Sequence, residues 1–218
     1  RGLGDVYKRQ SLSDDITRRL KPLAEAAHTR NATVLVDPSL IDEVRAMASG
    51  YLVAGKGSHT VAGTGQEQAK EWLNLVEPLL SSGRAYRLPY GNADVIGAAR
   101  QGRSSLLLTV KHAVDPSNPA AHLPLAIIDP AAELDNSSFK TLAKELSPSV
   151  ILTCAASVRK GVREDFGVKI VGLADTVRTS GHPQSNSDSQ RRGMLLSQAL
   201  LMTRESIPAV TLVTTVND

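Results

Sequence analysis

The sequence predicts an α/β fold in which mostly parallel strands alternate with helices, and a repeated pattern carries that prediction. Residues 32–44 run from a short apolar stretch through Asp37-Pro38 into the start of an amphipathic helix, which is typical of a strand that leads directly into a helix. Residues 125–135 repeat this order around Asp129-Pro130. The repeat predicts strand ends that open onto one face, where β/α proteins keep their functional residues.

Each predicted element rests on its own residue pattern. Helices are expected where apolar residues recur every three or four positions, and strands where short apolar runs are bounded by turn residues. Helices are therefore predicted at about 13–29, 40–48, 66–80, 94–101, 104–113, 138–146 and 189–203. Strands are predicted at about 33–36, 85–88, 125–129, 150–153, 168–173 and 210–216, with a short extended run at 51–53. Loops are expected at 54–65 and 179–188, where turn-forming residues gather.

This element order leaves two architectures open. Strands joined through helices call for right-handed crossovers and a mostly parallel sheet. An incomplete β/α barrel and an open doubly wound sheet both satisfy that requirement. The absence of a dinucleotide-binding glycine fingerprint favours the incomplete barrel.

The length of the chain predicts a single α/β domain over residues 11–218. A chain of 218 residues with 41% hydrophobic content is long enough for one sizeable core. Residues 1–10 resemble the translation of a sequencing adaptor, and we exclude them from the fold as a non-native tail. The strand at 210–216 has no helix after it, so we expect the domain to be truncated at both ends.

Composition gives no sign of a nucleic-acid partner. The formal net charge is +3, but Arg1, Lys8 and Arg9 against Asp5 supply +2 of it, which leaves +1 for the remaining chain. Aromatic residues make up only 3% of the chain, which disfavours stacking surfaces for single-stranded nucleic acid.

Three aspartates are the candidate catalytic residues. Asp37 and Asp129 each follow a predicted strand, and Asp175 follows the strand at 168–173 in an equivalent place. Carboxylates that converge at one mouth could act as acid and base, or as nucleophile, in glycoside hydrolysis. The alternative for Asp37 and Asp129 is helix capping, because Asp followed by Pro is a common start of a helix.

Five further residues are candidates for binding. Tyr90, Asn92 and Asp94 follow a strand through Pro89 and could line the same mouth, although turn chemistry explains this stretch as well. His59 and His182 lie in the two predicted loops, from which a titrating side chain could reach over the site. Their alternative is a solvated surface position.

The sequence predicts neither a metal site nor a cofactor. The five histidines show no spacing that places two imidazoles on one helix face, and the one cysteine excludes a multi-cysteine site. The nearest approach to a phosphate-binding loop is residues 50–58, where Gly57 stands in place of the required Ser or Thr. Nucleotide binding is thus the weakest of the functions considered. A serine-hydrolase elbow is also absent.

The chain resembles a bacterial cell-envelope family, the domain of unknown function 6049. The resemblance lies in residues 34–42 (Val-Leu-Val-Asp-Pro-Ser-Leu-Ile-Asp), 47–51, 69–73 and 87–94, in that order. It covers residues 11–110 well and the rest more loosely. Members usually carry Pro-Tyr-Ala-Asp-Pro-Asp where this chain has Pro-Tyr-Gly-Asn-Ala-Asp, so Asn92 stands in place of an acid.

This resemblance implies an extracytoplasmic location and a membrane anchor in the full-length protein. The β/α part of the family is similar to the barrels of glycoside hydrolases and polysaccharide deacetylases, which is a likeness of fold and not of reaction. We therefore expect a domain that binds a cell-wall glycan or an envelope protein, with a carbohydrate-active hydrolase as the alternative. The sequence does not determine the oligomeric state.

Overall fold

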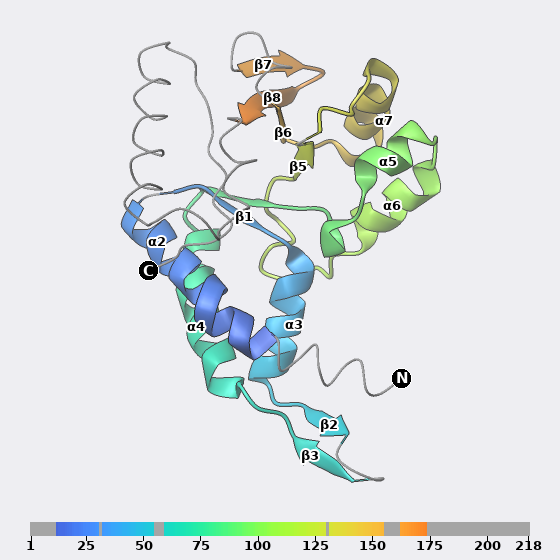
Figure 1. Ribbon diagram of the computed structural model, residues 1–218. Coiled ribbons are helices and arrows are strands. Elements are labelled where there is room, and N and C mark those ends of the chain that lie inside the picture. The colour runs from blue at the N-terminus through green and yellow to red at the C-terminus, as the bar shows by residue number, and fades with distance from the viewer. Residues whose placement is uncertain (1–11, 31, 55–58, 130, 155–161, 174–218) are drawn as a thin grey trace, which may run out of the picture. The chain divides into compact units, whose positions relative to one another are not determined.

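The computed structural model of the chain describes residues 12–30, 32–54, 59–129, 131–154 and 162–173 (Figure 1). These residues divide into two compact units. The first holds the described residues up to Ala93 and those from His112 to Pro124, and the second holds Asp94–Lys111 and the described residues from Leu125 onward. Both units combine helices with parallel strands, which confirms the α/β class. One domain over residues 11–218 stays a prediction.

The first helical segment of the first unit contains a widened turn. Residues 12–15 are helical, Ile16–Leu20 (η1) form a π-helix, and Lys21–Arg30 (α2) continue as an α-helix. The backbone N–H of Lys21 donates to the carbonyl of Ile16, five residues earlier. Pro22 explains this turn, because proline has no N–H and its ring crowds the preceding turn. The helix predicted at 13–29 is confirmed in outline, with this local change.

Two parallel strands lie at the centre of the first unit. Val34–Val36 (β1) pairs with Ala85–Arg87 (β4), with Val34 opposite Ala85. The chain between them forms Pro38–Ala48 (α3) and Gln66–Leu80 (α4). Because parallel strands cannot be joined by a tight turn, these helices supply the crossover.

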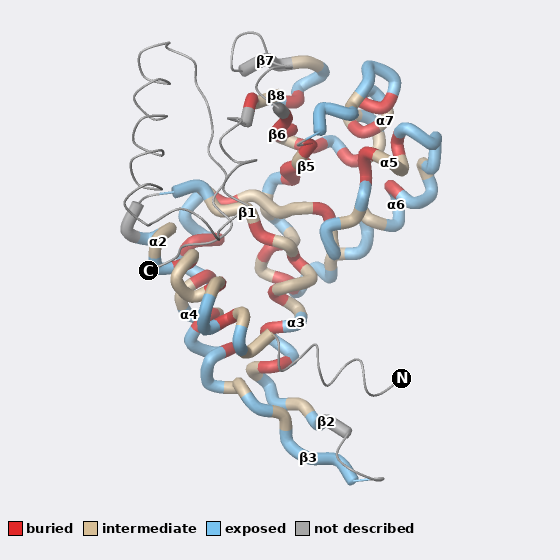
Figure 2. The backbone as a smooth tube through the Cα atoms, in the orientation of Figure 1, coloured by how far each residue is buried: buried red, intermediate tan, exposed pale blue. Residues whose placement is uncertain are grey.

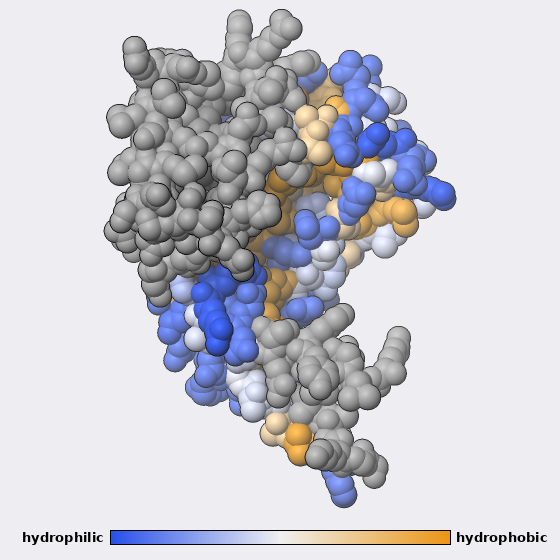
Figure 3. All heavy atoms as spheres, in the orientation of Figure 1, coloured by the Kyte–Doolittle hydropathy of each residue, from blue (hydrophilic) through white to orange (hydrophobic). Residues whose placement is uncertain are grey.

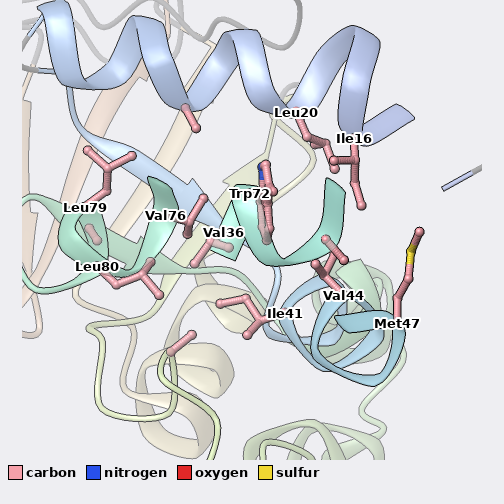
Figure 4. Close-up of a cluster of buried hydrophobic side chains, with 14 residues drawn as sticks. Ile16, Leu20, Val36, Ile41, Val44, Met47, Trp72, Val76, Leu79 and Leu80 are labelled. Carbon is pink, nitrogen blue, oxygen red and sulfur yellow. The ribbon is translucent and has the colours of Figure 1, made fainter. Parts of the chain in front are cut away.

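The helices bury one continuous apolar core. Its members come from η1, α2, β1, α3, α4 and β4, together with Ala120 (Figure 4). Trp72 lies at the centre of the labelled side chains and is 4% exposed. Figure 2 shows the same pattern as buried positions along α3 and α4, whereas their outer sides are exposed. Apolar spacing of three and four residues along α4, from Ala69 through Trp72 to Val76, predicts this buried face correctly.

A short hairpin interrupts the crossover between α3 and α4. Leu52–Ala54 (β2) and Thr60–Ala62 (β3) pair antiparallel, with Leu52 opposite Ala62. The sequence predicts the extended run at 51–53 but treats 54–65 as a loop. The second strand was missed because Thr-Val-Ala is too short to show a period between glycine-rich stretches.

The second unit is organised around a four-stranded sheet. Its strands are Ala126–Asp129 (β5), Val150–Cys154 (β6), Val162–Asp165 (β7) and Val168–Leu173 (β8), in the order β5-β6-β8-β7. The first three strands in this order are parallel, and β7 is antiparallel to β8. The helices are Val95–Arg100 (α5), Ser104–His112 (α6) and Asn136–Leu146 (α7).

Two predictions for the second unit need correction. Strand β7 was not predicted, because Val-Arg-Glu-Asp is too polar for a strand in the core of a sheet. It is the last strand in the order and therefore lies at an edge of the sheet, where charged residues are tolerated. It joins β8 through Phe166 and Gly167, whose positive φ angles of 50° and 74° suit a two-residue hairpin turn. Helix α7 begins at Asn136 and not at Ser138, and its N-cap is Asp135.

The parallel strands thus form two small sheets, and in the described residues no pairing closes either sheet into a barrel. Residues 155–161, the predicted helix 189–203 and the predicted strand 210–216 lie outside the described residues, as does the tail 1–10.

Candidate functional site

Asp37 lies at the carboxyl end of β1, where it caps α3. Its backbone is extended (φ −80°, ψ 121°), and its Oδ1 accepts a hydrogen bond of 2.9 Å from the N–H of Ser39. The same Oδ1 accepts a second bond of 3.0 Å from the N–H of Gly91, in the turn after β4. Gly91 has φ +65°, a conformation that glycine adopts without strain. Asp37 therefore starts one helix and ties the ends of two neighbouring strands together.

A polar cluster built around the buried Asn118 lies beside this cap. Asp42 on α3 accepts from two side chains, the hydroxyl of Tyr90 at 3.3 Å and the Nδ2 of Asn118 at 2.8 Å. Asn118 also donates to the carbonyl of Pro38 at 2.9 Å and accepts from the N–H of Ala120 at 2.8 Å. Asn118 is only 1% exposed, so these bonds replace water for its amide. Asp42, Tyr90 and Asn118 are called the Asp42 cluster below.

The segment 112–124 completes this part of the first unit. Arg45 donates to the carbonyl of Ser117 at 2.9 Å, and the Nε of Arg87 donates to the carbonyl of Leu123 at 3.2 Å. Burial lowers the pKa of Arg87, but an arginine side chain stays charged at neutral pH. These two cations and Asn118 hold the segment in place.

The sequence predicts Tyr90 as a binding residue but gives no sign of Asp42 or Asn118. Asn118 lies 76 positions from Asp42 in the chain, and the stretch Asp115-Pro-Ser-Asn-Pro119 looks like a simple chain break. Burial raises the pKa of the Tyr90 hydroxyl, and the carboxylates of Asp42 and Asp37 raise it further. The phenol therefore stays protonated at neutral pH and acts as a donor to Asp42.

The other candidate binding residues of the first unit do not gather at one point. Asn92 has φ 50° in the turn after β4, and it is exposed. His59 is also exposed and directly precedes β3. Asp37 begins α3 and His59 lies beyond its end, and a helix of 11 residues is about 16 Å long. His59 therefore does not join Asp37.

Asp94 opens the second unit as a helix cap. Its Oδ1 accepts a hydrogen bond of 2.8 Å from the N–H of Gly97, and the residue is exposed. A Cβ atom on Gly97 would lie 2.2 Å from the other carboxylate oxygen of Asp94. In this position the capping carboxylate would clash with the Cβ atom of any residue other than glycine at position 97.

Asp129 is a buried carboxylate with three hydrogen-bond donors. It ends β5 and is 2% exposed. Its Oδ1 accepts from the N–H of Glu133 at 2.9 Å, while its Oδ2 accepts from the N–H of Leu134 at 3.2 Å and from the hydroxyl of Thr153 at 3.3 Å. The helix that follows starts only at Asn136. The capping alternative for Asp129 is therefore wrong, because this carboxylate closes a loop and does not start a helix.

Asp175 and His182 lie outside the described residues. Convergence of Asp175 with Asp37 and Asp129 therefore stays a prediction. In the part of the chain that is described, no group of three or more His, Cys, Asp or Glu side chains could hold a metal ion. Within the same residues, no helix has both the length and the apolar character that a membrane span requires.

Comparison of the chain with protein-family models, with curated proteins and with solved structures finds no match.

Proposed function

We propose that this chain is a non-catalytic binding domain of the bacterial cell envelope, which holds a glycan or a protein partner during envelope assembly. The resemblance of residues 34–42, 47–51, 69–73 and 87–94 to the cell-envelope family supports this proposal. The same resemblance supports an extracytoplasmic location and a membrane anchor elsewhere in the full-length protein.

One observation carries the non-catalytic part of the proposal: Asp37 and Asp129, the two strand-end carboxylates among the described residues, already hold backbone amides. Asp37 holds two backbone amides, and Asp129 holds two amides and a hydroxyl. These bonds fix each carboxylate within a loop, whereas a catalytic carboxylate must be free to reach the atom on which it acts. Asp129 is also too buried to attack a sugar as a nucleophile. Both carboxylates are better suited to hold loops than to perform hydrolysis.

The turn after β4 is the proposed contact surface. Tyr90 is fixed by Asp42, and Gly91 is fixed by Asp37. Next to them, Asn92 presents an exposed amide that can both donate and accept hydrogen bonds. A rigid turn with such a side chain suits the alternating donors and acceptors of sugar hydroxyls, because little conformational entropy is lost when it binds.

We also propose that the two sheets are parts of one incomplete β/α barrel of the glycoside hydrolase and deacetylase type. The order β5-β6-β8 follows the sequence without reversal, whereas a doubly wound sheet reverses its order at a switch point. An experimental structure of a longer chain would support the barrel if it joined the sheets in sequence order. A reversed order would support the doubly wound alternative.

The function is tested by measuring binding and product formation in the same samples. The chain is mixed with soluble peptidoglycan and arabinogalactan fragments, and binding is followed by calorimetry while new reducing ends are counted. We expect binding without product. Asn92→Gly should weaken binding, since it removes the amide but keeps the positive φ; Asn136→Gly, at an exposed position on α7, is the matched control.

Two outcomes would contradict this proposal in different ways. Product that disappears in Asp37→Asn or Asp129→Asn would show a hydrolase, which is the alternative function. Binding that is equal in the Asn92→Gly variant and in the unmodified chain would remove the turn after β4 as the contact surface.

A further inference from the structure

The turn after β4 is held by two carboxylates that lie near the start of α3. Asp37 accepts a hydrogen bond of 3.0 Å from the N–H of Gly91, and Asp42 accepts one of 3.3 Å from the hydroxyl of Tyr90. Asp37 is the N-cap of α3, and Asp42 is the fifth residue of that helix. The conformation of the turn therefore depends on where the start of α3 holds these two side chains.

The side chain of Asn118 is bound to the same end of α3. Its Nδ2 donates to the carbonyl of Pro38 at 2.9 Å and to the Oδ1 of Asp42 at 2.8 Å, while its Oδ1 accepts from the N–H of Ala120 at 2.8 Å. An asparagine amide has two N–H donors, and both are used here. Because Asn118 is only 1% exposed, water offers its amide no other partner. The orientation of this amide is thus fixed by the protein.

Asp42 connects Asn118 to the turn. One carboxylate oxygen of Asp42, Oδ1, accepts from Asn118, and the other, Oδ2, accepts from Tyr90. A carboxylate is planar and rigid, so a donor that fixes one oxygen also directs the other. Tyr90 lies 48 positions from Asp42 in the chain, and Asn118 lies 76 positions from it. Asn118 therefore determines where the carboxylate of Asp42 meets the hydroxyl of Tyr90.

The segment 112–124, which carries Asn118, has anchors of its own. Ala120 is fully buried and belongs to the apolar core of the first unit. Arg45 on α3 donates to the carbonyl of Ser117 at 2.9 Å. These contacts do not involve the turn after β4, so the segment can hold Asn118 in place whether or not the turn is ordered.

We propose that Asn118 is a positioning residue for the contact surface at the turn after β4, and that the segment 112–124 sets the affinity of this surface through it. The inference rests on the proposed binding function of the turn and names what controls it. A surface that is ordered before binding loses less conformational entropy when the ligand arrives, so it binds more tightly. Without the Asn118 amide, the Asp42 carboxylate is free to turn away from Tyr90, and the exposed Asn92 is left on a looser turn.

The first test measures the order of the turn and needs no ligand. NMR order parameters of the backbone N–H groups of Gly91 and Asn92 are about 0.85 if the turn is rigid and below about 0.6 if it is flexible. We expect values near the rigid limit in the unmodified chain and a fall of about 0.1 or more in Asn118→Ala. Asp42→Asn should cause a smaller fall, because one acceptor oxygen remains at position 42.

A matched control separates this effect from a general loss of stability. Val76→Ala removes methyl groups from the buried core of the same unit, where Val76 is 4% exposed. It should destabilise the chain and leave the order parameters of the turn unchanged. An ordered turn in both Asn118→Ala and Asp42→Asn would overturn the inference.

An exchange of the two side chains tests whether Asn118 acts through Asp42. Asn118→Asp alone places a second carboxylate against Asp42, and like charges repel, so the turn should loosen. When Asp42→Asn is added, the new amide can donate to the new carboxylate and keep its oxygen for Tyr90. Order should then return to the turn, although the hydrogen bond to Pro38 stays lost. A double variant that is no more ordered than Asn118→Asp would show that Asn118 only supports its own segment, which would overturn the inference.

The effect on affinity is measured by calorimetry with the same soluble peptidoglycan and arabinogalactan fragments. The dissociation constant should rise about three- to tenfold in Asn118→Ala, which is the ordinary cost of ordering a few groups on binding. It should recover in the double variant and stay unchanged in Val76→Ala. Leu52→Ser is a surface control, because Leu52 is 68% exposed on β2 and Figure 3 shows an apolar spot over the β2–β3 hairpin. This variant should bind normally.

Failure of this inference differs from failure of the proposed function. If the unmodified chain binds no fragment, both are overturned. If the unmodified chain binds and Asn118→Ala binds equally well, this inference alone is overturned. Binding that is lost in Leu52→Ser would place the ligand on the hairpin and would also overturn the inference.

Discussion

Asp37 and Asp129 occupy the same place in the same dipeptide pattern, yet they do different work. At Asp37 the helix starts at the next residue, and one carboxylate oxygen holds both amides. At Asp129 a loop separates the strand from α7, and both oxygens are used inside a buried turn. An Asp-Pro pair after a strand therefore caps the next helix when that helix begins at once. It closes a loop when the helix begins several residues later. The dipeptide alone does not decide between them.

The largest expected effect is the difference in stability loss when each of these two aspartates is replaced by asparagine. Asp129→Asn should cost about 2–3 kcal/mol of stability, because an amide offers one acceptor oxygen and its NH₂ would face a donor. Asp37→Asn should cost less than about 0.5 kcal/mol, because asparagine caps helices as well as aspartate does. Hydrogen exchange of the Leu134 and Ser39 amides measures each corner locally. Equal losses of exchange protection at both amides would contradict the different roles assigned to Asp37 and Asp129.

A third aspartate that holds a backbone amide extends the comparison. Asp94 caps α5 over Gly97, so Gly97→Ala should gain about 0.5–1 kcal/mol of helix propensity and lose a similar amount by displacing the cap. In an Asp94→Ala background the same substitution should be stabilising. A double-mutant cycle followed by urea unfolding should give a coupling of about 1 kcal/mol. A coupling near zero would show that the carboxylate does not depend on the glycine.

The pH dependence of stability tests the role of Asp135 as the N-cap of α7. A hydrogen bond from the N–H of Ser138 lowers the pKa of Asp135 in the folded chain. Its contribution is therefore present above the unfolded pKa of about 3.9 and is lost as the pH falls through the lower folded value. Thermal melts of Asp135→Asn, which keeps the cap, should lose less stability on acidification than those of the unmodified chain. Parallel pH profiles would contradict this assignment.

A small effect is also expected in the Asp42 cluster, which lies beside the Asp37 cap. Tyr90→Phe removes one hydrogen bond of 3.3 Å, so we expect a loss of about 0.5–1 kcal/mol at neutral pH. The pKa of Tyr90 is raised in the folded chain, so its contribution is complete below the unfolded pKa of about 10 and is lost as the pH rises through the folded value. Urea unfolding at neutral pH and at about pH 11 should therefore give a smaller difference between variant and parent at the higher pH. A difference that grows with pH would be inconsistent with this hydrogen bond.

The features that the sequence predicts well are the local ones. Helix α4 and the Asp37 cap depend on residues within a few positions of each other, so their spacing is visible in the sequence. The role of Asp129 depends on Thr153, which arrives from the next strand, and on the length of the loop before α7. The Asp42 cluster depends on Asn118, which folds back from a distant segment. Strand β7 was missed because an edge strand needs no apolar pattern.

The core of the first unit holds the chain's sole tryptophan, and this has a practical consequence. Trp72 is buried, and its indole Nε1–H has no hydrogen-bond acceptor among the described residues. Its emission should therefore be blue-shifted in the folded chain and should move to the red when this core opens to water. Thermal unfolding followed by tryptophan fluorescence reports on the first unit only. Thermal unfolding followed by far-ultraviolet circular dichroism reports on both units. A difference between the midpoint temperatures of the two curves would show that the two units unfold independently.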